Sequence, residues 1–384
     1  MVEDMKHAIP PTTHLPDESL LSTPALSPAA STDPSPAFAT ILKTPDLELD
    51  QFNFDLGESA HDSNIAQSNL KVPECWGHRG ASATYPENTR ESFKEACKAG
   101  ADGIETDIHI TSDGVLVMFH DPELSRTTDG KGRIDELPWK GVLEHVRTLH
   151  APHQPIPLFE EVLDILMMPE NAHVKLNIDC KVENDPVQLF GLIKAALEGR
   201  KDWAHHLAPR IVLGLWHPRY LEPAASILPY LPRYAISMSL AQLRTYFFSH
   251  CHGFSVMYEA LASADGARFR KECRQAGKAI CAWTVNGKEE MRQCARWEIQ
   301  SVISDKPDQW RKIKDEILRD RKAALKPTLA TYVLPFLQTR YYSFSYQRLA
   351  QEETEYLEKE AGSFSSVKVA PSSLKIAKPE DSLN

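Results

Sequence analysis

Cysteine is scarce in this sequence, and the few cysteines present form no metal-binding pattern. The chain has seven cysteines among 384 residues, and no two of them are spaced as Cys-x-x-Cys. An odd number without paired spacing argues against a disulfide framework and against a thiolate zinc site. We therefore expect free thiols in a reducing compartment.

Long apolar runs are also absent. No uninterrupted run of about 18 apolar residues is present that could span a bilayer. The amino terminus has no basic segment followed by an apolar one, which is the pattern of a secretory signal. These absences disfavour a transmembrane anchor and secretion, and they favour an intracellular protein.

Positive charge is in deficit. The chain has 43 Lys and Arg residues against 53 Asp and Glu residues, a formal net charge of −10 at pH 7. Most of the acidic excess lies in the first 70 residues, whose basic residues are Lys6 and Lys43, so the remainder is near neutral. Binding to a phosphate backbone requires clustered Lys and Arg, and the sequence has no basic stripe with interleaved aromatic residues. We expect no nucleic-acid partner.

Residues 1–70 are poor in large apolar side chains. They are rich in Pro, Ser, Thr and Ala, as the run from Ser27 to Pro36 illustrates. Such a segment cannot bury enough apolar surface to offset the conformational entropy lost on folding. The composition predicts a disordered tail over residues 1–70.

From residue 73 onward, short apolar runs alternate with amphipathic stretches. About eight strand and helix pairs over roughly 245 residues are typical of a closed parallel barrel. We predict an α/β fold, a TIM (β/α)8 barrel over residues 73–320. An open doubly wound sheet is the alternative, but no Gly-x-Gly-x-x-Gly follows the first strand. The predicted strands are 74–77, 103–108, 115–119, 174–180, 210–215, 233–237, 253–257, 279–284 and 301–303, and the predicted helices are 91–99, 159–167, 186–197, 218–228, 240–248, 267–275, 288–295 and 307–318.

Titratable side chains gather where the first apolar runs end. Glu105 and Asp107 are two residues apart, so on a strand both carboxylates leave the same face. Paired carboxylates suit a hard divalent cation, and a metal site is the first hypothesis. His78 and His120 each end an apolar run, and histidines that titrate near neutral pH can pass protons. A general acid and base pair is the second hypothesis, although each signal alone also fits a structural residue or a solvated face.

The order of these motifs resembles that of the glycerophosphodiester phosphodiesterase family. The shared motifs are His-Arg-Gly at 78–80, Pro-Glu-Asn-Thr at 86–89, Glu-x-Asp at 105–107, His-Asp at 120–121 and Trp-Thr-Val-Asn at 283–286. The likeness covers roughly residues 73–318. It implies a TIM barrel that cleaves glycerol-linked phosphodiesters with the help of a metal ion. Within the motif at 86–89, Asn88 is also expected to N-cap the first helix, with Glu91 three residues later.

The strand predicted at 174–180 supplies the next candidates. Asn177, Asp179 and Lys181 share one face of it. A buried Asp and Lys can simply pair with each other, but the resemblance implies that Asp179 is the third metal ligand beside Glu105 and Asp107, and that Lys181 faces the phosphate. The family more often has Glu where this chain has Asp179, so a shifted ion or a ligand through water is conceivable. Oxygen ligands favour one Mg²⁺ or Ca²⁺ ion over zinc.

Further roles follow from the resemblance alone. His78 and His120 would act as base and acid, in an order that the sequence leaves open, and Arg79 would stabilise charge that develops on the phosphate. Trp283 would be a wall against the glycerol or lipid backbone, or else a cap on the core. Asn286 would contact the substrate.

Two features narrow the resemblance to the fungal phosphatidylglycerol phospholipase C branch of the family. The segment between His120 and the helix predicted at 159–167 has roughly 37 residues, too few for a substantial capping subdomain, so we expect an open barrel mouth. An open mouth suits a headgroup that is still attached to a membrane. The sequences at 212–216, 236–240 and 253–256 also look like that branch.

Residues 321–350 combine basic and aromatic side chains. An aromatic and apolar stretch runs from Pro327 to Tyr346 and is interrupted by Pro335. A basic cluster precedes it, formed by Arg319, Arg321, Lys322 and Lys326. We predict a membrane-interfacial segment, with docking on the outer helices of the barrel as the alternative. Residues 351–384 are expected to form a short charged helix, to about residue 360, and then a disordered tail.

These observations together predict a metal-dependent phosphodiesterase of phospholipase C type. Its expected substrate is phosphatidylglycerol, hydrolysed to diacylglycerol and glycerol phosphate by a protein peripheral to a membrane or lipid droplet. The alternative is a soluble glycerophosphodiesterase that acts on glycerophosphocholine-like diesters. A catalytically silent lipid-binding barrel is a third hypothesis, disfavoured because all the catalytic side chains that the resemblance implies are present.

Overall fold

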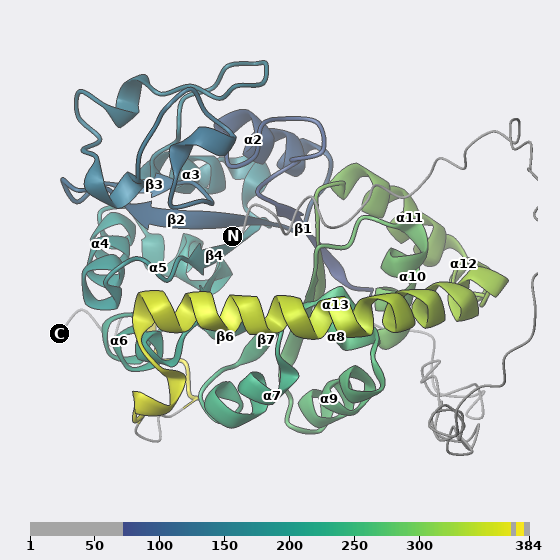
Figure 1. Cartoon of the computed structure of the whole chain (residues 1–384). Coiled ribbons are helices and arrows are strands. Elements are labelled where there is room, and N and C mark those ends of the chain that lie inside the picture. The colour runs from purple at the N-terminus through teal and green to yellow at the C-terminus, as the bar shows by residue number, and fades with distance from the viewer. Residues whose placement is uncertain (1–71, 370–373, 380–384) are drawn as a thin grey trace, which may run out of the picture. The chain divides into compact units, whose positions relative to one another are not determined.

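The computed structural model describes residues 72–369 and 374–379, and at positions 330 and 332–345 it describes the backbone alone. The predicted tail at 1–70 lies outside the described residues. Within them, eight parallel strands close into a barrel, because β1 (Glu74–His78) pairs with both β2 (Gly103–Ile110) and β9 (Ser301–Ser304). Figure 1 shows helices surrounding these strands. The predicted TIM barrel is confirmed.

The elements follow one another in the order that the sequence pattern predicts. The remaining strands are β3 (Leu116–Met118), β4 (Lys175–Cys180), β5 (Ile211–Leu215), β6 (Arg233–Ser237), β7 (Gly253–Met257) and β8 (Ala279–Trp283), and β3 pairs antiparallel with β2. The helices are α2 (Arg90–Lys98), α3 (Phe159–Met167), α4 (Pro186–Glu198), α5 (Trp203–His206), α6 (Leu221–Ile227), α7 (Leu240–Gln242), α8 (Tyr258–Ala262), α9 (Ala264–Gln275), α10 (Lys288–Trp297), α11 (Pro307–Arg319), α12 (Arg321–Ala324) and α13 (Leu329–Ala361). Two predicted helices are divided: a 3-10 turn precedes α6, and the π-helix Leu243–Phe247 follows α7.

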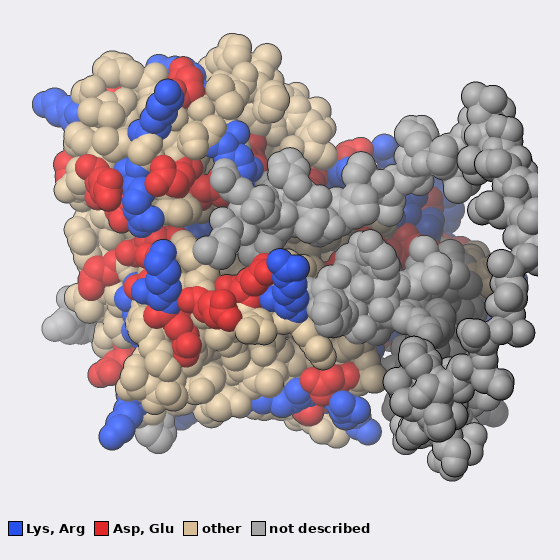
Figure 2. All heavy atoms as spheres, in the orientation of Figure 1, with Lys and Arg blue, Asp and Glu red and all other residues tan. Residues whose placement is uncertain are grey.

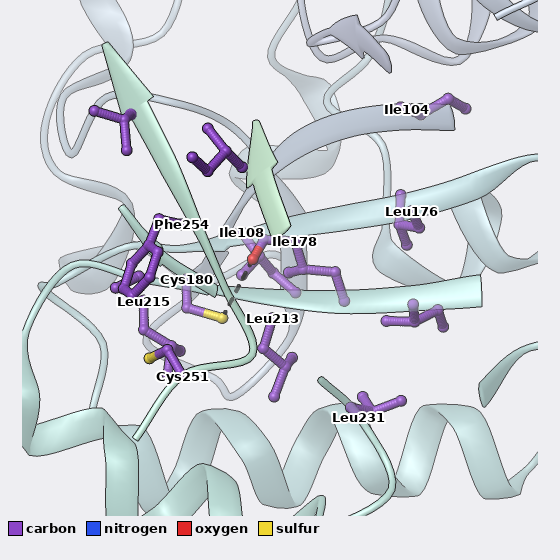
Figure 3. Close-up of a cluster of buried hydrophobic side chains, with 14 of the residues drawn as sticks. Ile104, Ile108, Leu176, Ile178, Cys180, Leu213, Leu215, Leu231, Cys251 and Phe254 are labelled. Atoms are coloured by element: carbon purple, nitrogen blue, oxygen red, sulfur yellow. Dashed lines mark hydrogen bonds between the residues drawn. The ribbon is translucent and has the colours of Figure 1, made fainter. Parts of the chain in front are cut away.

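The strands are buried on both faces. Outward side chains, among them Ile108, Ile178 and Leu213, form one large apolar cluster between the strands and the helices (Figure 3). A smaller apolar cluster contains Trp76 of β1, and Gly103 leaves room for it, since a Cβ at Gly103 would lie 2.6 Å from the Trp76 ring. The titratable residues lie farther along β1 and β2, toward their carboxyl ends. All seven cysteines are free thiols, as predicted.

The start of α2 differs from the prediction. The N-cap is Thr89, whose side chain accepts a hydrogen bond from the Ser92 N–H, and not Asn88. Asn88 adopts a left-handed backbone conformation with φ of +53° and turns its amide toward β2. Long-range hydrogen bonds to β2 therefore engage the Asn88 side chain, which local capping rules would assign to the start of the helix. The helix ends as expected, with Gly100 at φ +81°.

The segment between β3 and α3 is short but folded. It contains three 3-10 turns, at Leu124–Arg126, Ile134–Glu136 and Leu143–His145. Their apolar side chains form a separate small core with Val117 and Phe119. The segment therefore has a fixed conformation beside β2.

Helix α13 crosses one end of the barrel in Figure 1. Its partners lie after the carboxyl ends of strands: Gln242 follows β6, helix α8 follows β7, and Glu289 follows β8. The end that it crosses is thus the one where barrel enzymes carry their chemistry. The predicted open barrel mouth did not take this helix into account.

Three expectations for the carboxyl-terminal region are corrected. The helix passes through position 335, because the fixed φ of proline is itself helical and the cost is confined to one turn. The expected boundary between residues 350 and 351 falls inside the same helix. The described part of the expected disordered tail is ordered, with Phe364 only 2% exposed. In the part of the chain that the structure describes, no helix has the length and apolar character needed to cross a bilayer.

Candidate active site

The turn after β1 joins the first two strands at the site. Arg79 has a φ of +56°, and its backbone N–H donates to the carbonyl oxygen of Glu105 at 2.8 Å and to its carboxylate at 3.1 Å. Gly80, with φ of +87°, passes so close to α2 that a Cβ would lie 2.4 Å from the Ser92 hydroxyl. The turn therefore fixes the Arg79 side chain beside the carboxylates of β2.

Strand register brings the three predicted metal ligands together. Asp107 on β2 lies opposite Asp179 on β4, and Glu105 lies opposite Asn177. Carboxylate oxygens of Glu105, Asp107 and Asp179 lie within 4.8 Å of one another, and all three residues are buried. Asn177 is 1% exposed, and neither atom of its amide has a hydrogen-bond partner within the described residues. Unpaired buried polar atoms beside three carboxylates indicate a place for an ion or water.

Two buried cations face the carboxylates. The Lys181 ammonium lies 2.7 Å from Asp107 Oδ1 and 2.8 Å from Asp179 Oδ2, while Arg79 Nε lies 3.4 Å from Asp107 Oδ2. Asn88 Nδ2 donates to the same Asp107 oxygen at 2.7 Å. With all groups ionised, the three carboxylates carry one more negative charge than Lys181 and Arg79 balance. A divalent cation would therefore make the net charge of this cluster positive.

The environment separates the pKa values of the three carboxyls. Burial raises the pKa of Glu105 well above its usual range, and Asp107 and Asp179 raise it further. Burial also opposes ionisation of Asp107, but the charges of Lys181, His120 and Arg79 and the hydrogen bond from Asn88 together outweigh it and hold that pKa well below its usual value. Burial raises the pKa of Asp179 to about 6, although Lys181 acts in the opposite direction. A divalent cation would favour the ionised form of all three, and the oxygen donors fit Mg²⁺ or Ca²⁺.

The His78 ring is held by the carboxylate of Asp305, which directly follows the last barrel strand. Its Nδ1 lies 2.6 Å from Asp305 Oδ1, which also accepts from the Ser82 hydroxyl at 2.8 Å. Asn286 Nδ2 donates to the other Asp305 oxygen at 2.6 Å, and Asn286 Oδ1 accepts from the Asp305 N–H and the Ser304 hydroxyl. Because both ends of its amide are engaged, Asn286 orients Asp305. The substrate contact expected of Asn286 stays a prediction.

The His120 ring is held by a second carboxylate, that of Asp121. Its Nδ1 lies 2.5 Å from Asp121 Oδ1, and Arg126 donates to the other oxygen of Asp121. Arg126 also donates to Glu87 at 2.7 Å, and Glu87 accepts in turn from Arg79 at 2.8 Å. Arg126, in the segment between β3 and α3, therefore links Asp121 beside His120 to Glu87 beside Arg79.

The two histidines present the same ring atom to the site. A carboxylate holds Nδ1 of each ring, which leaves Nε2 of His78 and of His120 for a ligand. Burial, with the nearby charges of Arg79 and Lys181, lowers the pKa of His120 to about 3. The neutral ring of His120 is thus the stable form before a substrate or ion binds.

Two tryptophans meet beside Asp179. The ring of Trp283 lies edge-on to that of Trp216, with centroids 5.9 Å apart. Trp216 Nε1 donates to Asp179 Oδ1 at 2.7 Å, whereas Trp283 Nε1 is buried with no hydrogen-bond partner in the described part of the chain. The free indole N–H of Trp283 is consistent with its predicted place along a substrate wall.

Sequence reasoning missed four residues that orient this site: Asn88, Arg126, Trp216 and Asp305. Asn88 lies inside the Pro-Glu-Asn-Thr motif, but its motif position suggested only a cap. Asp305 follows the last strand directly, as His78 ends the first one, and this shared position could have suggested a pair. No sequence signal distinguishes Arg126 or Trp216.

A TIM barrel with a buried carboxylate triad, and with two histidines each held by a carboxylate at its carboxyl end, suits metal-assisted cleavage of a phosphodiester. The model of the Glycerophosphoryl diester phosphodiesterase family matches residues 78–309, which is more than half of the sequence. The chain belongs to this family. It is a phosphoric diester hydrolase with glycerophosphodiester phosphodiesterase activity.

Individual relatives agree with this membership. A Glycerophosphodiester phosphodiesterase of Bacillus altitudinis is 26% identical over 259 residues, which are 64% of this chain and 100% of that protein. Glycerophosphodiester phosphodiesterase 1 of Mus musculus is 42% identical over 96 residues, 22% of this chain and 28% of that protein. An Oleispira antarctica phosphodiesterase, solved in complex with the product sn-glycerol-3-phosphate, has a TM-score of 0.54 at 22% identity, covering 64% of this chain and 97% of its own. That structure supports the fold.

Proposed function

We propose that this protein is a phospholipase C type phosphodiesterase that hydrolyses phosphatidylglycerol to diacylglycerol and glycerol phosphate. The observation that carries the phosphodiesterase chemistry is the buried triad of Glu105, Asp107 and Asp179. It lies beside two cations and two histidines, each of which is held by an aspartate. The lipid preference rests on the resemblance to the fungal branch and on exposed leucines beside the basic cluster that precedes α13. We infer that one Mg²⁺ or Ca²⁺ ion binds the triad.

Each side chain has a distinct part in the proposed reaction. The bound cation would neutralise phosphate oxygens and lower the pKa of the attacking hydroxyl. Nε2 of one histidine takes the proton of that hydroxyl, and Nε2 of the other gives a proton to the leaving oxygen. Arg79 and Lys181 stabilise the charge that develops on the phosphate. By family resemblance, the attacking hydroxyl is that of the substrate's own glycerol, so the step forms a cyclic phosphate that water then opens.

We further propose a peripheral attachment to an intracellular membrane or lipid droplet. Leu318 and Leu329 are 67% and 79% exposed, and they flank the basic cluster that includes Arg319 and Lys326. Exposed apolar side chains next to cations suit a surface with anionic headgroups. The aromatic side chains at 332–345 lie outside the described residues, so the interfacial segment stays a prediction. The face in Figure 2 mixes Lys and Arg with Asp and Glu among the described residues, so the described part of that face has no one-sign charge patch that would distinguish a partner.

A soluble diesterase is the second candidate. The matched relatives carry the name Glycerophosphodiester phosphodiesterase, which favours deacylated diesters such as glycerophosphocholine. The same triad and histidines would serve either substrate. The two candidates therefore differ in which substrate can reach the site at the end of the barrel, and they share the same reaction chemistry.

The test compares substrates under identical metal conditions. Purified protein is given phosphatidylglycerol vesicles, glycerophosphoglycerol or glycerophosphocholine, with Mg²⁺, Ca²⁺ or chelator, and product release is measured for wild type, His78→Ala and His145→Ala. His145 is an exposed histidine that pairs with Glu144 and takes no part in the contacts described for the site, so its variant should match wild type. Metal-dependent diacylglycerol release from vesicles, lost only in His78→Ala, supports the lipid proposal. Turnover of the soluble diesters alone replaces it with the second candidate.

A further inference from the structure

Helix α13 is an addition to the family barrel. The family match ends at residue 309, and the Bacillus altitudinis relative is covered completely by 64% of this chain. The 33-residue helix begins at Leu329 and is followed by an ordered turn at Phe364–Ser366. An addition that packs on the catalytic end of the barrel can affect the site that the matched barrel region builds.

The carboxyl-terminal half of α13 is anchored by buried contacts. Leu357 is 3% exposed, and Glu353, 5% exposed, accepts a hydrogen bond at 3.2 Å from the Met238 N–H just after β6. Thr354 Oγ1 accepts from Gln242 Nε2 at 2.8 Å. These buried contacts together fix this half of the helix on the barrel.

The helix also holds the loop that follows β4. The Tyr356 hydroxyl donates to the carboxylate of Glu183, which is two residues beyond Lys181. Arg219 bridges the same loop to the helix: its guanidinium donates to the Asn184 carbonyl at 3.1 Å and to the Glu360 carbonyl at 3.5 Å. The strand that carries Asp179 therefore ends in a loop tied to α13.

The end of the helix holds the loop that follows β5. His217 is fully buried, and its Nε2–H donates to the Gly362 carbonyl at 3.0 Å. Its ring packs edge-on against Phe364 with centroids 4.4 Å apart. The preceding residue, Trp216, donates its indole N–H to Asp179 at 2.7 Å. A continuous series of contacts therefore runs from Phe364 through His217 and Trp216 to a carboxylate of the triad.

We propose that the segment from Tyr356 to Phe364 positions Asp179 and thereby sets the affinity of the triad for its divalent cation. The proposal rests on the metal site described under the proposed function. Asp179 is held from two sides, by Lys181 and by Trp216, and the loops of both residues are tied to this segment. Partners that orient a ligand typically change metal affinity about 10- to 100-fold when they are removed. Tyr356 and Phe364 are positioning residues, since neither touches the triad.

The test measures metal binding directly, without a lipid or any turnover. Mg²⁺ and Ca²⁺ are titrated calorimetrically into metal-free wild type, Trp216→Phe, Phe364→Ala and Tyr356→Phe, and the melting temperature of each metal-free protein is recorded. We expect Trp216→Phe to bind about 10-fold more weakly or worse, by loss of a ligand partner. Phe364→Ala and Tyr356→Phe should each weaken binding at least about threefold, since they act one step farther away.

Two controls separate positioning from stability. Ile317→Ala removes a buried side chain of α11, outside the contacts just described, and should lower the melting temperature with unchanged metal affinity. Glu355→Gln changes an exposed residue of α13 and should change neither. Wild-type metal affinity in a folded Phe364→Ala or Tyr356→Phe protein would overturn the proposal. If wild type bound neither cation, the metal site itself would be wrong, and this failure is visible whatever the lipid substrate proves to be.

Discussion

The carboxylate of Asp305 is the most direct place to test how His78 works. Asp305 accepts from His78 and Ser82 on one oxygen and from Asn286 on the other. Asn286 cannot turn its amide, because its own oxygen already accepts from the Asp305 N–H and from Ser304. In Asp305→Asn, the new amide must therefore keep its oxygen toward Asn286 and turn its NH₂ group toward His78.

The consequence is a change of tautomer. An NH₂ group facing Nδ1 makes that nitrogen an acceptor, so the proton of neutral His78 moves to Nε2, the atom that would serve the substrate. General acid–base catalysis contributes about 10²- to 10⁴-fold, so kcat should fall by at least about 10²-fold, equivalent to about 3 kcal/mol of transition-state stabilisation. KM should change little, because Asp305 lies behind the ring.

The assay is steady-state hydrolysis of whichever glycerophosphodiester wild type turns over, at saturating metal. Asp308→Asn is the matched control, because Asp308 is an exposed aspartate on α11 that pairs with Lys312 at 3.3 Å, and it should retain wild-type kcat. Adding His78→Ala to Asp305→Asn should cost little more, since the two changes remove one function. A kcat for Asp305→Asn within about threefold of wild type would refute this account of His78.

Three further predictions concern pH, an ion pair and the core. Because burial raises the pKa of Glu105 well above its usual range and that of Asp179 to about 6, protons compete with the cation at both carboxyls, so calorimetric Mg²⁺ affinity should fall as the pH drops and should still be falling through about 6; a pH-independent affinity would argue against both residues as ligands. Arg126→Ala should lower the free energy of unfolding in urea by about 3 kcal/mol, since it leaves Glu87 and Asp121 without their shared partner, and an unchanged midpoint would contradict that role. Phe254→Ala should cost about 3–5 kcal/mol in the same measurement while the folded fraction keeps wild-type kcat, and a loss below about 1 kcal/mol would show that the core relaxes around it.

Much of the fold is readable from the sequence because the barrel repeats one local pattern. The strands at 233–237 and 253–257 have the bounds that the apolar runs predict, since each strand is buried and flanked by polar turns. The pairing of Glu105 with Asp107 also follows from local geometry, whereas Asp179 is expected from the family resemblance. Two carboxylates on one strand face share a direction, and parallel register brings the neighbouring strand alongside.

The remaining features depend on long-range contacts that no local rule contains. Asn88 satisfies the capping rule, but the energy of its bond to buried Asp107 exceeds that of a cap exposed to solvent. Pro335 suggests an interruption, but α13 continues through it, and its later half gains buried contacts with loops that precede it by about a hundred residues or more. Local propensity is outweighed in both cases by packing.

The pairing of β1 with β9 also makes the site depend on the last event in barrel assembly. His78 and Asp305 stand on opposite sides of that seam and are 227 residues apart in sequence. Contacts of such high contact order form late, because the intervening chain must first lose its freedom. A refolding protein would therefore regain its secondary structure before His78 has its carboxylate, and recovery of hydrolysis would report circular closure of the sheet.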